Sequence, residues 1–280
     1  PFIFLDHMGP AEFAPGAEGV NVRPHPHIGL STLTYLFEGE IHHRDNLGYS
    51  QPIRPGEVNW MTAGKGIVHS ERTDPLKRST GGPMHGMQAW IALPDELEET
   101  APAFHHHGED DQPTYDNAGL YARLVAGEAY GAKAAVPVSS PLFYVHWELA
   151  EGVRTAPPPG KGPGGMSERA LYVVRGEIEV GDRTFGEGQL VVLEPAAEPT
   201  IKAVRASTVM VLGGEPVGQR LIWWNFVASS QARLDQAKAD WKAGRMVLPK
   251  DDDHEFIPLP DTPSISETDS GAKPAPTHPV

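Results

Sequence analysis

Tyr35-Leu-Phe-Glu-Gly-Glu-Ile41 decides the fold of this 280-residue chain, because a close copy, Tyr172-Val-Val-Arg-Gly-Glu-Ile178, follows 137 residues later (172 − 35). In both copies a short run rich in β-branched and aromatic residues meets a glycine turn and then a second short run. A weaker match, Pro55-Gly-Glu-Val58 with Glu187-Gly-Gln-Leu190, continues the pattern. A repeat of such units predicts an all-β chain built as two similar sandwiches or barrels.

The composition agrees with this fold class. Hydrophobic residues make up 39% of the chain, which is enough for a packed core, and 30 glycines with 28 prolines favour a turn-rich β protein over a helical one. There is no cysteine, so no disulfide framework supports the fold and a reducing compartment is permitted.

The charge of the chain excludes several classes of partner. The formal net charge is −14, and such a surface repels phosphate backbones and anionic lipids, which argues against direct nucleic-acid or membrane binding. The only apolar run at the start, Pro1-Phe-Ile-Phe-Leu5, is too short for a signal peptide, and no run approaches the roughly 18 residues of a membrane span. We therefore expect a cytoplasmic protein.

The domain limits follow from the repeat and from local composition. We expect one barrel over residues 1–115 and a second over 116–260, with a polar, proline-rich and disordered tail over 261–280. One helix is predicted over 229–243, where a serine can cap the first turn, Gly244 ends the last, and three apolar residues share one face: Leu234, Ala237 and Trp241.

Two short motifs in the first half predict a metal site. His25 and His27 stand two residues apart, as do His69 and Glu71, and side chains at i and i+2 of a β-strand project from the same face. Imidazoles with a carboxylate suit one divalent Fe, Mn, Ni, Cu or Zn ion, and four protein ligands leave open positions for water, dioxygen or a chelating substrate. The absence of sulfur ligands argues against a zinc finger or an iron–sulfur cluster.

The repeat also predicts that the second barrel is metal-free. Shifting the two histidines of the first motif by 137 residues gives Gly162 and Gly164, and shifting His69 and Glu71 by 132 gives Ile201 and Ala203. None of these four residues has a side chain that can bind a metal.

Other histidines fit structural roles better than ligation. Neighbouring side chains on a strand point to opposite faces, so His42 and His43 cannot both bind one ion, although His42 could line the pocket. Asp45 has no metal-ligand partner at a suitable spacing, and we interpret residues 105–107, three consecutive histidines, as a solvated loop.

Together the motifs resemble the pirin family of bicupin proteins, in the cupin superfamily. The resemblance rests on His25-Pro-His-Ile-Gly29, Asp45-Asn-Leu-Gly48, Trp60-Met-Thr-Ala-Gly-Lys-Gly-Ile-Val-His-Ser-Glu71 and Gly86-Met-Gln-Ala-Trp90, and it runs from about residue 1 to 260. It implies two jelly-roll β-barrels packed face to face. It also implies that one Fe(II) ion is bound in the N-terminal barrel, by His25, His27, His69 and Glu71.

The resemblance implies two functions of different classes. One is quercetin 2,3-dioxygenase activity on a small phenolic substrate and dioxygen, with Glu71 either a permanent ligand or a catalytic general base. The alternative is a non-enzymatic iron-binding regulator that contacts a transcription factor or a metabolic enzyme. Two positions depart from the family pattern: Ser31 replaces a glutamate common there, and Ile28 replaces an arginine, which would remove a charge near the mouth of the site.

Overall fold

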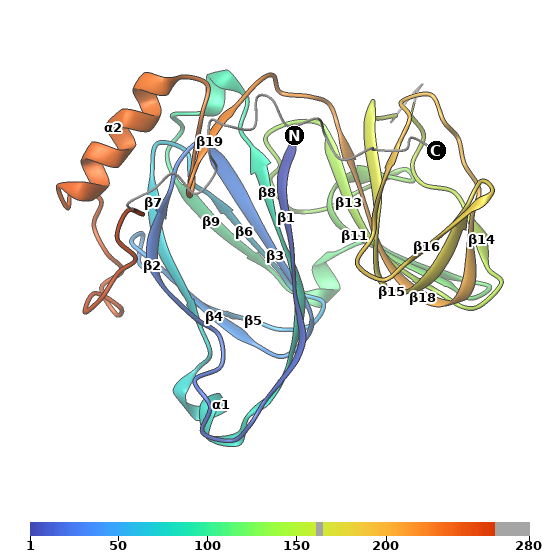
Figure 1. Ribbon diagram of the computed structural model, residues 1–280, viewed down its shortest axis with the longest axis horizontal. Helices are drawn as coiled ribbons and strands as arrows, with labels where there is room; N and C mark the ends of the chain where they lie inside the picture. The colour runs from blue at the N-terminus through green and yellow to red at the C-terminus, as the bar shows by residue number, and fades with distance from the viewer. Residues whose placement is uncertain (161–164, 261–280) are drawn as a thin grey trace. The chain divides into compact units, whose positions relative to one another are not determined.

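The computed structural model describes residues 1–160 and 165–260 (Figure 1). Gly162, Gly164 and the predicted tail over 261–280 lie outside the described residues. Contacts divide the described chain into two units: residues 2–109 with 217–260, and residues 110–216 with Pro1. In both units the regular structure consists mainly of antiparallel strands, as the sequence predicted.

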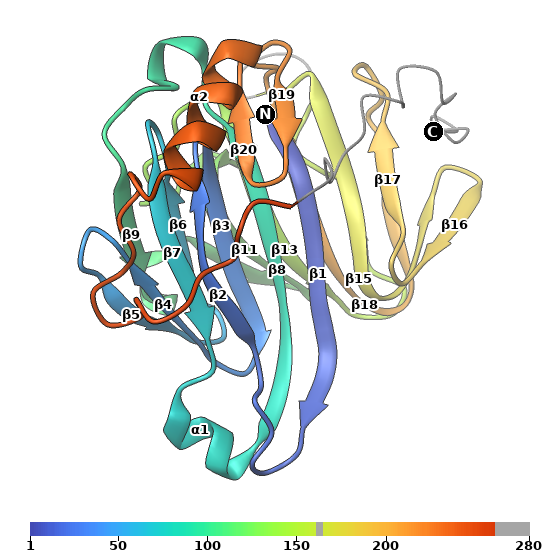
Figure 2. The same ribbon diagram turned by 60° about the vertical axis from the view of Figure 1, so that its left-hand side comes forward.

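The N-terminal unit is a jelly roll of two facing sheets (Figures 1 and 2). The five-stranded sheet has the order β1 (Phe2–Phe13), β8 (Gly82–Ala92), β3 (Leu30–Glu38), β6 (Val58–Thr62) and β9 (Ala103–His107). The four-stranded sheet has the order β2 (Asn21–His27), β7 (Ile67–Arg72), β4 (Ile41–Asp45) and β5 (Ser50–Ile53). Apolar side chains from both sheets fill part of the space between them, including Leu30, Met61, Ile67 and Phe104.

The C-terminal unit is a single nine-stranded sheet. Its main path is β10 (Thr114–Asn117), β11 (Leu120–Ala129), β13 (Leu142–Leu149), β18 (Ile201–Gly214), β15 (Glu168–Val180) and β16 (Arg183–Gly186). Three short strands pair beside this path: β12 (Ala132–Lys133), β14 (Arg154–Thr155) and β17 (Leu190–Leu193). Ile201 and Ala203, the counterparts of His69 and Glu71 in the repeat, are buried in its apolar core.

The repeat is less regular in space than in sequence. In the first half β3 ends before the Gly39 turn and β4 starts after it. In the second half the strands expected on either side of Gly176 merge into one long strand, β15, whose pairing with β18 shifts register around Arg175 and Glu177. Gly176 has φ +93°, so it bends a continuous strand there instead of ending it.

The predicted helix is present as α2 (Gln231–Lys242), capped by Ser230, whose hydroxyl accepts a hydrogen bond from the backbone of Arg233. The three predicted core residues, Leu234, Ala237 and Trp241, are buried as expected. They pack on Ile28 and Val68 and on the hairpin of β19 (Leu221–Trp223) and β20 (Phe226–Ala228) (Figure 2). Residues 217–260 therefore belong with the first barrel, which differs from the limits expected from the sequence.

The remaining helical segments are short. They are α1 (Pro75–Thr80) and two single 3-10 turns, Asp95–Leu97 and Glu109–Asp111. Within residues 1–160 and 165–260, no helix has the length and apolarity needed to cross a bilayer.

The expectation of a loop at residues 105–107 was wrong, because these histidines end β9, which pairs with β6 along the edge of the five-stranded sheet. Phe104 is buried one residue earlier, so this polar stretch is held by a strand pair and by one apolar anchor.

Gly29, directly after the first histidine motif, has a steric role that can be tested. Its φ is +69°, and a Cβ atom there would lie 2.0 Å from the carbonyl oxygen of Val227 in β20. Gly29→Ala should therefore lower the free energy of unfolding by more than the roughly 1 kcal/mol that a left-handed backbone costs a non-glycine residue. Gly16→Ala is the matched control, since Gly16 has φ +83° with open space around it. Both variants would be measured by urea denaturation. Equal losses in the free energy of unfolding would contradict this assignment.

Candidate metal centre

Three adjacent strands bring the predicted metal residues to one place. In the order β2-β7-β4, His25 pairs directly with His69, and His69 pairs with Asp45 on its other side. Directly opposed residues share a face of the sheet, so the alternate residues of all three strands point into the barrel. Val68, one position from His69, points to the outer face and packs under α2.

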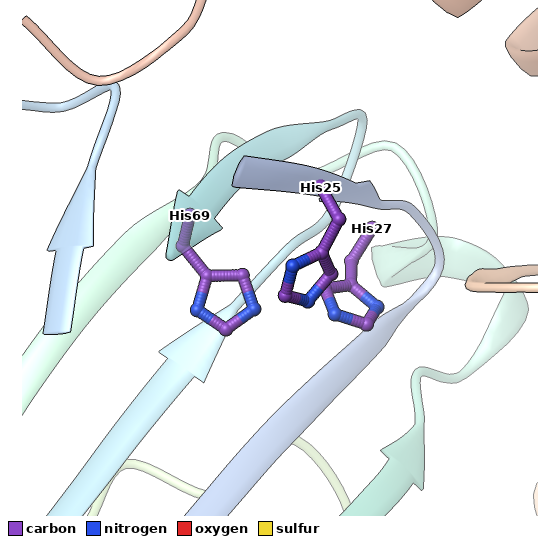
Figure 3. Close-up of side chains that lie close together, drawn as sticks. All are labelled: His25, His27 and His69. Carbon is purple, nitrogen blue, oxygen red and sulfur yellow. The ribbon is translucent and has the colours of Figure 1, made fainter. Parts of the chain in front are cut away.

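His25, His27 and His69 converge in this interior (Figure 3). One nitrogen from each ring lies within 4.8 Å of the others, and all three side chains are buried. Two nitrogens on opposite sides of one ion are roughly 4 Å apart, given a metal–nitrogen bond of about 2.1 Å. Within the described residues, these three histidines are the one group of His, Asp or Glu side chains compact enough to hold an ion.

Hydrogen bonds fix the tautomers of two of these histidines. The Nδ1 atom of His25 lies 2.9 Å from the carbonyl oxygen of Arg23, and that of His27 lies 3.1 Å from the carbonyl oxygen of Asn225. A carbonyl oxygen can only accept, so Nδ1–H donates in both cases and the lone pair resides on Nε2. Outer contacts of this kind orient metal-binding histidines in other proteins.

The same site keeps its imidazoles neutral. Burial, and to a lesser extent the neighbouring histidines, lower the pKa of His27 and His69 well below the usual value of 6.5. Burial also lowers the pKa of His25, although the nearby Glu71 carboxylate opposes this shift. Neutral imidazole is the form that binds a metal ion.

The Nε2 atom of His69 tests directly whether the site fits a metal. This atom is buried and has no hydrogen-bond partner in the described part of the chain. A buried nitrogen without a partner normally costs about 1–3 kcal/mol, and a bound ion would remove that cost. The donor set, three neutral imidazoles with a carboxylate nearby, therefore fits a divalent transition metal.

Glu71 lies beside this cluster and not within it. Its buried carboxylate accepts hydrogen bonds from Nε2 of Gln88, at 3.1 and 3.0 Å, and from the hydroxyl of Thr34, at 3.3 Å. Gln88 and Thr34 belong to the facing sheet, and sequence reasoning did not identify either of them. Gln88 lies in Gly86-Met-Gln-Ala-Trp90, one of the stretches that carry the family resemblance, but nothing in the spacing of either residue marks it as a partner of Glu71.

His43 is a third residue near the site that the sequence analysis did not select. Its side chain points inward opposite Glu71, whereas His42 points away and bonds to the hydroxyl of Ser50. The suggestion that His42 lines the pocket was therefore wrong by one residue. The spacing of His43 and Asp45, again two residues on one strand, was the available signal.

The two departures from the family pattern have structural explanations. Ser31 is buried and donates a hydrogen bond to the hydroxyl of Thr62, so it supplies no carboxylate to the site. Ile28 is buried in the apolar cluster under α2, so an apolar side chain fits this position.

A separate cavity of about 320 Å³ lies in the N-terminal unit, near α1. Phe13, Arg54, Lys77, Arg78 and Met84 contribute to its walls, and none of the three clustered histidines does. We assign no chemistry to it.

Comparison with known proteins places these observations in a wider group. A family described as pirin matches residues 1–91, and its C-terminal cupin domain matches residues 144–247. A pirin-like protein of Caulobacter vibrioides is 62% identical over 93% of this chain and 89% of its own length. A Pseudomonas aeruginosa protein, named provisionally as a quercetin 2,3-dioxygenase, is 40% identical over 86% of this chain and 74% of its own length.

A solved structure agrees with this result. The structure of a quercetin 2,3-dioxygenase from Acinetobacter baumannii superposes with a TM-score of 0.84 at 34% identity, covering 95% of this chain and 86% of that one.

Proposed function

The chain belongs to the pirin family of bicupin proteins, and on that premise we propose that it is a metal-dependent dioxygenase of flavonols such as quercetin. The observation that carries the proposal is the cluster of three buried, neutral histidines beside a buried carboxylate, in the barrel matched by the N-terminal family profile. Two relatives of known sequence or structure bear the name of this activity, which supports the choice of substrate class. The proposal includes a cytoplasmic location, which the absence of cysteine permits.

His25, His27 and His69 would hold the ion, with the Glu71 carboxylate beside them. We propose Fe(II) as the native metal, with Mn, Ni, Cu and Zn as ions that the same donors accept. When bound, the metal would supply Lewis acidity toward the oxygen atoms of a chelating substrate and the redox chemistry that dioxygen requires.

Glu71 is the base in this proposal. A flavonol must lose a hydroxyl proton before it reacts, and Glu71 is a buried carboxylate beside the histidine cluster. Gln88 donates to both carboxylate oxygens, which fixes the plane of the carboxylate, while the remaining lone pairs can accept the proton.

An oxygen-electrode assay tests the proposal. Protein loaded anaerobically with one Fe(II) per chain is mixed with quercetin and then with dioxygen. We expect one dioxygen to be consumed and one carbon monoxide released for each flavonol that disappears. Metal-free protein is the control for uncatalysed oxidation. If the iron-loaded protein consumes no oxygen with quercetin or with other flavonols, the dioxygenase assignment is wrong.

A further inference from the structure

A chain of hydrogen bonds links His69 to two further buried polar side chains, those of His43 and Asp45, and leads away from the metal cluster. Nδ1 of His69 lies 3.4 Å from Nδ1 of His43, and Nε2 of His43 lies 2.9 Å from Oδ2 of Asp45. All three residues are buried, with His69, His43 and Asp45 being 1%, 3% and 1% exposed. They come from two neighbouring strands, β7 and β4, so the sheet itself sets their spacing.

Asp45 and His43, the two members behind His69, are both held in place. The other carboxylate oxygen of Asp45, Oδ1, accepts the backbone N–H groups of Leu47 and Tyr49, at 2.9 and 3.1 Å. The ring of His43 stacks on Phe104, with centroids 4.2 Å apart and planes inclined by 13°. The carboxylate therefore cannot turn, and Oδ2 alone faces His43.

The donor and acceptor in each of these hydrogen bonds determine which nitrogen of His69 carries the lone pair that can bind a metal. A carboxylate oxygen only accepts, so Nε2–H of His43 donates to Asp45, which leaves the lone pair of a neutral His43 on Nδ1. That lone pair accepts Nδ1–H of His69. The lone pair of His69 is then on Nε2, the buried atom without a partner in the described residues.

We infer that Asp45 and His43 are positioning residues that set the tautomer of His69 and so prepare its Nε2 to bind the metal. His25 and His27 need no such chain, because each donates to a backbone carbonyl, which can only accept. An imidazole partner can donate or accept, so His43 gives His69 a fixed polarity only because Asp45 stands behind it. This inference rests on the proposed metal site, but not on the identity of the metal or of the substrate.

Replacing one carboxylate oxygen of Asp45 with an amide nitrogen should reverse the direction of both hydrogen bonds. In Asp45→Asn the amide oxygen must stay at the Oδ1 position, because two backbone N–H groups point at it. The amide NH₂ then faces His43 and donates to its Nε2. His43 must carry its proton on Nδ1 and donate to His69, whose own proton moves to Nε2 and blocks the metal-binding lone pair.

Two measurements test this inference without any assay of activity. In the metal-free protein at pH 8, ¹⁵N NMR of the histidine rings should show His69 with its proton on Nδ1, and Asp45→Asn should move that proton to Nε2. Cobalt(II) titration should show affinity reduced about tenfold to a hundredfold in the variant, the range typical for the outer contacts of a metal-binding histidine.

A double-mutant cycle separates this role from simple support of the fold. His43→Phe keeps a flat ring against Phe104 but breaks the chain, so adding Asp45→Asn in that background should change the cobalt affinity less than about twofold. The matched control is on the opposite face of β4, where His42 lies 3.7 Å from Asp74. His42→Phe and Asp74→Asn should leave cobalt affinity unchanged.

Two outcomes would overturn the inference: an unchanged His69 tautomer in Asp45→Asn, or equal losses of affinity from Asp45→Asn with and without His43. Because the tautomer is read in the metal-free protein, it stays informative even if the flavonol assay fails.

Discussion

His69→Ala is expected to abolish stoichiometric metal binding. The wild-type protein, reconstituted anaerobically, should hold about one divalent ion per chain, because the described residues form one compact cluster of this kind. Removing His69 deletes the ligand whose free nitrogen is already buried and without a partner in the described chain. We expect affinity to fall by more than about 100-fold, since even residues outside the ligand set cost tenfold to a hundredfold. His25→Ala should have a similar effect.

The measurement is metal content after gel filtration, together with cobalt(II) titration of each variant. Circular dichroism would show that each variant is still folded. His105→Ala and His254→Ala are controls for ions held by surface histidines, since both side chains are exposed. Retention of a full equivalent of metal, at unchanged affinity, by both His69→Ala and His25→Ala would refute the assignment of the site.

Much of the fold was predictable because it rests on short-range patterns. Strand alternation and glycine turns repeat in both halves, and α2 carries its own cap and apolar face. The barrel to which α2 belongs was not predictable. An apolar helix face does not specify its partner, and here Val68 of β7 and Ile28, which follows β2, cover it.

The candidate site divides in the same way. The spacing in His25-Pro-His27 and in His69-Ser-Glu71 predicts two pairs of inward side chains, and the structure brings the three histidines together. The consecutive histidines of β4 carry no information about which one faces inward, so the only signal for His43 was its two-residue spacing from Asp45. The contact of Gln88 with Glu71 was not predictable from the sequence, since it crosses the space between the two sheets.

Glu71→Gln should reduce turnover per bound metal by about 100-fold or more. The substitution keeps the shape of the side chain and its ability to accept from Gln88, but removes the negative charge and the basicity. Loss of a general base typically costs about 10²–10⁴ in rate. The rate must be expressed per bound metal, because a neutral side chain beside the histidines would also weaken metal binding.

Two features of this chain make that test sharp. Ser31 stands where a second carboxylate is common in the family and is bonded to Thr62, so no other acid from that motif can replace the missing base. Glu98→Gln is a matched control, since Glu98 is a buried carboxylate of the same unit that accepts a backbone N–H from Ser229. Its turnover should match wild type. If Glu71→Gln keeps the wild-type rate per metal ion, Glu71 is at most a ligand or a structural group, and the proton must leave the substrate by another route.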